Sequence, residues 1–137
     1  MKSGKRLLLL ILAAILLFTA AGCGRTARVR TDLGPSELYT DRELRLAARA
    51  AARWFRIHFD GCALTSLRYP GDEWEERYQA AAERYGAVRA VVLLSDFEVG
   101  PEGGDGSLPP DSAVRNWQWI LVQDELGFWR HADHGYG

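Results

Sequence analysis

The N-terminal apolar run Leu7–Phe18 constrains this chain most, because it decides which residues are free to fold. Positively charged residues precede the run, and small residues follow it as far as Cys23, which is the pattern of a secretory signal peptide. The run is also shorter than the ~20 apolar residues that a membrane-spanning helix needs. We therefore expect residues 1–22 to be a cleaved signal peptide and the mature chain to begin at Cys23.

The residues at the expected cleavage site are Ala20, Ala21, Gly22 and Cys23. This tetrad resembles the lipobox of bacterial lipoproteins, in which the cysteine sulfur receives a diacylglycerol. The resemblance implies that Cys23 is lipidated and that the chain lies on the extracytoplasmic face of the cell membrane, since two acyl chains suffice for stable anchoring. The alternative is an ordinary secretory signal in which Cys23 is incidental.

The net charge and the cysteine content indicate which binding partners and which disulfides the chain can have. Of the 17 basic residues, three lie in the signal peptide, and the remaining fourteen against 18 acidic residues give a mature net charge of about −4. An exported, acidic chain is a poor match for a nucleic-acid partner. With Cys23 lipidated, Cys62 has no disulfide partner in the chain, and we expect a buried packing residue rather than a reactive thiol.

The mature chain divides into two parts. Residues 23–38 mix Arg, Thr, Gly and Pro without an apolar period, which is typical of a lipidated N-terminus followed by a linker. Residues 39–137 are long enough for one domain with a single core.

Local signals place two helices in this domain. Thr40 and Glu43 form a capping box, which predicts a helix from there to about Phe59. Gly61 is suited to the left-handed backbone conformation that commonly follows the end of a helix. A second helix is predicted after Pro70–Gly71, with Asp72 as its cap and Gly86 at its end.

Alternating apolar residues predict strands over residues 62–69, 88–99, 116–123 and 128–136. Residues 100–112 have no apolar period and are expected to form a long loop between two strands, here called the glycine-rich loop. The order of elements predicts an α+β fold with two helices covering one face of a curved antiparallel sheet, as in the cystatin-like and NTF2-like cones.

Several separated motifs resemble an uncharacterised domain family of Gram-positive envelope lipoproteins, which is also similar to the extracellular domain of BlaR-type membrane metallopeptidases. These motifs are 59–65 (FDGCALT), 85–87 (YGA), 91–95 (VVLLS), 103–108 (GGDGSL), 116–122 (NWQWILV) and 135–137 (GYG). The resemblance implies a fold, an envelope location and a binding or sensing role, and it implies no reaction.

Catalytic and metal-binding motifs are weak. On a regular strand His131 and Asp133 would share a face while His134 points away, so only two of these three side chains could meet one metal ion. Asp105 lies among glycines, where a calcium loop is conceivable, but the spacing does not match an EF-hand and a loop with positive φ explains the glycines. We expect no catalytic residues, no metal and no cofactor.

Aromatic residues are dense for a domain of this size. Most should lie in the core, but a cone fold can leave a cavity, and such a cavity is a natural ligand pocket. The residues that we expect could line it are Trp74, Tyr78, Asp96, Trp117, Trp119 and His131. The alternative for Trp117 and Trp119, which alternate onto one face of a strand, is the core.

Arginines recur on one side of the first predicted helix, from Arg42 to Arg56. They either face solvent or contact anionic lipid headgroups. Together these features predict a lipid-anchored extracytoplasmic binding or sensory domain, with a small ligand or an envelope protein as its partner. The alternatives are a small envelope hydrolase or isomerase and a structural partner in an envelope complex.

Overall fold

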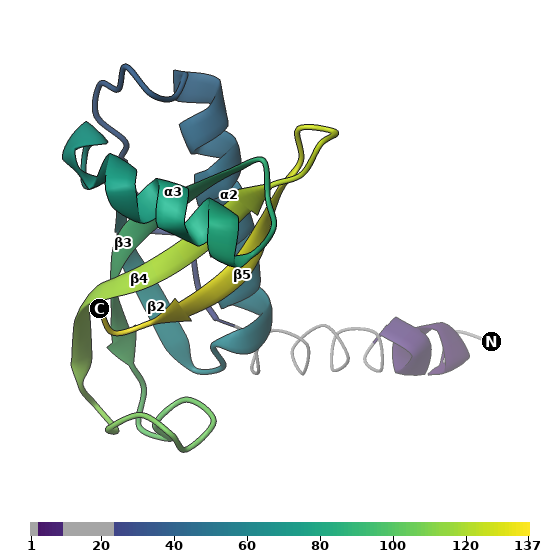
Figure 1. Ribbon diagram of the computed structural model, residues 1–137. Helices are drawn as coiled ribbons and strands as arrows, with labels where there is room; N and C mark the ends of the chain where they lie inside the picture. Colours follow the sequence, from purple (N-terminus) through teal and green to yellow (C-terminus); the bar gives the residue numbers. More distant parts are fainter. Residues whose placement is uncertain (1–2, 10–23) are drawn as a thin grey trace.

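The computed structural model describes residues 3–9 and 24–137 (Figure 1). Cys23 and most of the predicted signal peptide lie outside the described residues. Within the described ranges, no helix is both long enough and apolar enough to cross a membrane.

Helix α2 spans Asp41–His58, as its end signals predict. Thr40 Oγ1 accepts a hydrogen bond from the Glu43 backbone N–H, and the Glu43 carboxylate accepts one from the Thr40 N–H, so the predicted capping box is confirmed. The helix buries one face, made of Leu44, Ala47, Ala48, Ala51 and Phe55. After Phe59, Gly61 turns the chain with φ of +70° into the next strand.

The second helical region differs from its prediction. A single 3-10 turn, η1 (Asp72–Trp74), leads into α3 (Glu75–Arg84), and no side chain caps either helix. Asp72 instead accepts hydrogen bonds from Ser36 Oγ (2.5 Å), the Glu37 N–H (2.7 Å) and Tyr69 Oη (2.6 Å). The prediction of Asp72 as a helix cap was therefore wrong, because Ser36 and Glu37, which are distant in sequence, and the nearby Tyr69 donate to its carboxylate.

Five strands form one sheet in the order β1-β2-β3-β4-β5. Their bounds are β1 Arg30–Asp32, β2 Cys62–Arg68, β3 Arg89–Val99, β4 Ala113–Gln123 and β5 Trp129–Gly135. The pairs from β2 to β5 are antiparallel, but β1 runs parallel to β2. The sheet is thus mixed rather than antiparallel as predicted.

The extra strand changes the role of the expected linker. From Gly24 onward, this segment follows the edge of β2: the Arg25 N–H donates to the Cys62 carbonyl (2.9 Å), and the Leu64 N–H donates to the Arg25 carbonyl (2.8 Å). Residues 24–32 therefore belong to the folded unit, in contrast to the free linker expected there.

Helices α2 and α3 lie on opposite faces of the sheet. In Figure 1, α3 crosses the sheet in front and α2 runs behind it. α3 packs on Ala90, Ile120 and Val122, whereas Val91 and Leu121, which alternate with them, belong to the core cluster that contains the buried face of α2. The expectation that both helices cover one face was wrong. The chain has an α+β fold with three helices packed on a five-stranded mixed sheet that is not closed into a barrel.

Candidate ligand pocket

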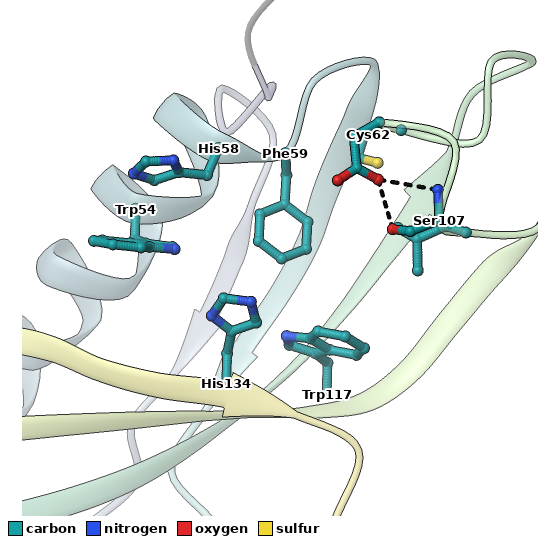
Figure 2. Close-up of a pocket in the computed structure, with 10 residues that line it drawn as sticks. Trp54, His58, Phe59, Cys62, Ser107, Trp117 and His134 are labelled. Carbon is teal, nitrogen blue, oxygen red and sulfur yellow. Dashed lines mark hydrogen bonds between the residues drawn. The ribbon is translucent and has the colours of Figure 1, made fainter.

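A cavity of about 330 Å³ opens where α2 ends, β2 and β4 begin and β5 ends (Figure 2). Its lining combines aromatic rings with polar side chains in nearly equal measure. The lining residues are Trp54, His58, Phe59, Cys62, Gly104, Asp105, Ser107, Leu108, Trp117 and His134. Aromatic walls with a few converging polar groups are typical of small-molecule sites.

Local folding explains how these residues meet. The turn at Gly61 after α2 brings Phe59 and Cys62 to the same end of the cavity, and the glycine-rich loop folds back over these two residues. In that loop the Asp105 carboxylate accepts hydrogen bonds from the Ser107 N–H (3.0 Å) and the Ser107 hydroxyl (2.5 Å) (Figure 2). Gly104 passes so close that a Cβ there would lie 3.6 Å from the Cys62 sulfur. The loop therefore forms one wall of the cavity.

Two tryptophans of the lining have unused hydrogen-bond donors. In the described part of the chain, three indole Nε1 atoms are buried and have no partner, those of Trp54, Trp117 and Trp129, and the first two belong to side chains that line this cavity. Figure 2 shows the nitrogen of each of these two indoles on the side of the ring that faces His134. By contrast, Trp119 donates through Nε1 to Ser95 Oγ at 2.8 Å. A buried donor without an acceptor costs free energy, so Trp54 and Trp117 are suited to an acceptor that enters the cavity.

Histidines connect the cavity to the sheet. His131 stacks on Trp54 with 3.9 Å between ring centroids, and its Nε2 lies 2.8 Å from His134 Nδ1. Burial, together with the neighbouring His134, lowers the pKa of His131 to about 4. Burial also lowers the pKa of His134. Both imidazoles are accordingly neutral at pH 7, and one donates to the other.

This arrangement corrects the prediction for the C-terminal strand. A register shift between Ile120 and Leu121, opposite β5, breaks the alternation. His131 and His134 consequently share a face, and the Asp133 carboxylate accepts a hydrogen bond from Tyr85 Oη (2.9 Å). The expected pairing of His131 with Asp133 was therefore wrong.

The Asp105 carboxylate and the Cys62 thiol, which both line the cavity, differ in their protonation state. Hydrogen bonds from Ser107 lower the pKa of Asp105, so this carboxylate is ionised at neutral pH. Burial raises the pKa of the Cys62 thiol, which is fully buried and therefore stays protonated. Across the described ranges, no group of three or more His, Cys, Asp or Glu side chains is placed to hold a metal ion.

The residues predicted for a pocket do not line one cavity. Trp117 forms a wall of this one, and His131 lies behind it against Trp54. Trp119 is fully buried in the core, and Tyr78 is 2% exposed.

The two remaining predicted residues have partners elsewhere. Asp96 pairs with Arg68 at 3.3 Å and accepts from the Asn116 N–H at 3.0 Å. The Arg77 guanidinium lies over the Trp74 ring, with its central carbon 4.3 Å from the centroid of the ring.

Several residues of the cavity were not among those predicted to line a pocket. Trp54 and His58 lie four residues apart and so share a helix face, which could have singled them out. His134 carried no such signal, because its direction depends on the register shift.

Comparisons with known proteins found no relative from which a function of this cavity could be inferred. No protein-family model matches the chain, no curated protein matches it, and no solved structure matches it.

Proposed function

We propose that this chain is a lipid-anchored, extracytoplasmic binding or sensory domain whose ligand enters the cavity between α2 and the glycine-rich loop. The observation that carries the proposal is the pair of unpartnered indole donors, Trp54 Nε1 and Trp117 Nε1, beside a cavity of about 330 Å³. The predicted lipobox at Cys23 supports the anchor and the location.

The lining indicates the chemistry of the ligand. Aromatic rings on several sides favour a flat, apolar body, and the two indole N–H groups favour carbonyl or carboxylate oxygens on that body. The ionised Asp105 at the loop favours a donor or a positive charge at the other end of the molecule. We infer a small planar ligand with oxygen acceptors.

Binding is favoured over catalysis by the state of the reactive groups. A nucleophilic cysteine requires a thiolate, and burial holds the Cys62 thiol protonated. The alternative, an envelope hydrolase or isomerase, depends on His134, whose neutral imidazole lines the cavity and is able to act as a base.

A cone-type fold and membership of the envelope lipoprotein family remain proposals. The sheet face against α2 suits the cystatin-like or NTF2-like arrangement, in which ligands bind between helix and sheet. The position of α3 on the other face argues against a complete cone.

A ligand screen tests the binding proposal. All strands and both core clusters lie within residues 24–137, so this stretch can be used alone. We would screen small aromatic carboxylates and amides by the NMR shifts of the indole N–H signals. Hits should move the signals of Trp54 and Trp117, and Trp117→Phe should abolish binding while Trp74→Phe, outside the cavity, retains it. Hits that leave both signals unmoved, or that survive Trp117→Phe, would contradict the proposal.

Anchoring is tested separately. Incorporation of labelled palmitate by a bacterial host should disappear in Cys23→Ser and persist in Cys62→Ser. Labelling that survives Cys23→Ser would exclude the lipid anchor without affecting the cavity.

A further inference from the structure

The chain enters the folded domain at the C-terminal end of α2. The Gly24 N–H donates to the Arg56 carbonyl at 3.0 Å, and Gly24 is buried. A Cβ at this position would collide with the carbonyl oxygen of Phe55, so the contact requires glycine. Since the residue before Gly24 is the predicted lipidation site, a lipid there would hold this end of α2 beside the bilayer.

One side of α2, from its second turn to its C-terminal end, presents unneutralised positive charge. Arg45, Arg49, Arg53 and Arg56, here called the arginine face, are all exposed. No acidic residue occurs between Leu44 and Phe59. The ion pairs in the described part of the chain are Arg68–Asp96 and Arg89–Glu43, so none involves the arginine face.

An apolar groove runs beside these arginines. It lies between α2 and β5, has a volume of about 600 Å³, and is lined by both charged and apolar side chains. Arg49, Arg53 and Arg130 contribute charge, while Leu46, Ala50, Trp54 and Trp129 contribute apolar surface. Ile57, also in the lining, is 52% exposed. Arginine and tryptophan beside exposed aliphatic surface suit the boundary between headgroups and acyl chains.

We propose that the arginine face and the adjoining α2–β5 groove lie against the anionic headgroups of the membrane that anchors the chain. This inference rests on the proposed anchoring for its orientation, but the surface is complete without Cys23. The acidic residues of η1 and α3, Asp72, Glu73, Glu75, Glu76 and Glu83, belong to the region that packs on the other face of the sheet. The chain thus has a basic side for the bilayer and an acidic side away from it.

Vesicle binding by residues 24–137 tests the surface without the lipid. Co-sedimentation should occur with vesicles of phosphatidylcholine and phosphatidylglycerol, and not with phosphatidylcholine alone. Added salt should release the protein, because exposed charges are screened. Equal binding to both vesicle types, or no binding to either, would overturn the proposal, while palmitate labelling would still report on the anchor.

Charge-reversal variants locate the contact. Each arginine near an anionic surface strengthens binding about fivefold, so Arg49→Glu with Arg53→Glu should weaken it at least about 25-fold. The matched control is Arg77→Glu with Arg84→Glu on α3, which makes the same change in net charge and should leave most binding intact. Equal losses in the two double variants would show a net-charge effect only and overturn the assignment. Arg49→Gln with Arg53→Gln, a milder change, checks that the loss does not come from unfolding.

The exposed apolar residue provides a second comparison. Ile57→Asp should weaken binding to the anionic vesicles, whereas Val88→Asp, at a residue that is 58% exposed and outside the lining of the groove, should not. Binding unaffected by Ile57→Asp would remove Ile57 from the contact, and binding lost equally in both variants would count against the proposed orientation.

Discussion

His131 and His134 lie side by side on one face of β5, with His131 Nε2 2.8 Å from His134 Nδ1. Their neighbours, Trp54 stacked on His131 and Trp117 beside His134, both have buried indole donors without a partner. The histidine pair therefore couples the wall of the cavity to the edge of the sheet, and its protonation should influence both stability and ligand binding.

Stability should fall on mild acidification. The pKa of His131 is lowered to about 4 in the folded chain, whereas an unfolded imidazole titrates near 6.5. The unfolded chain thus binds protons more readily between these values, so the stabilisation is complete above pH 6.5 and is lost as the pH falls toward 4. The urea midpoint should decrease between pH 6.5 and about 5, above the range of ordinary carboxylates.

The matched variants for this pH dependence are His131→Gln and His58→Gln. His131→Gln should flatten the decrease, and His58→Gln, at an exposed histidine, should preserve it. An unchanged slope in His131→Gln would assign the acid sensitivity to other groups.

Two neighbouring tryptophans should respond differently to the same substitution. Trp119→Phe leaves Ser95 Oγ without its buried donor, whereas Trp117→Phe removes a donor that has no partner. Both variants lose similar volume, so Trp119→Phe should be more destabilising by about 1–3 kcal/mol. Urea unfolding measures the difference. Adding Ser95→Ala to each variant completes the comparison, since coupling should appear with Trp119 alone.

Asp72 should hold the segment before α2 in place. Its carboxylate binds Ser36 and the Glu37 N–H, and Ser36 Oγ in turn accepts from the Leu38 and Tyr39 N–H groups at 3.1 and 3.0 Å. Asp72→Ala should accelerate hydrogen exchange at the amides of residues 37–39. Glu73→Ala, at the adjacent exposed carboxylate, should not. Equal protection in both variants would mean that packing alone fixes the segment.

Cys62 should react slowly in the folded protein. Its side chain is fully buried, and burial raises the pKa of its thiol. Iodoacetamide labelling of residues 24–137 should be slow in buffer and fast in denaturing urea. Fast labelling in buffer would indicate that the cavity opens to the thiol and would revive a chemical role for Cys62.

Local patterns in the sequence were enough to place the elements whose signals lie within a few residues. The capping box at Thr40 and Glu43 and the turn at Gly61 placed α2, because a helix end is decided by hydrogen bonds within a few residues. Alternation likewise placed β2, β3, β4 and β5, since the side chains of a strand divide between its two faces.

How these elements meet depends on tertiary contacts. β1 lacks an apolar pattern and forms because β2 offers it an edge, and Asp72 does not cap a helix because Ser36 and the Glu37 N–H donate to it from a distant part of the chain. The register shift opposite β5 places His134 in the cavity and Asp133 outside it. Pairing, register and long-range hydrogen bonds depend on partners distant in the chain, which a local pattern does not encode.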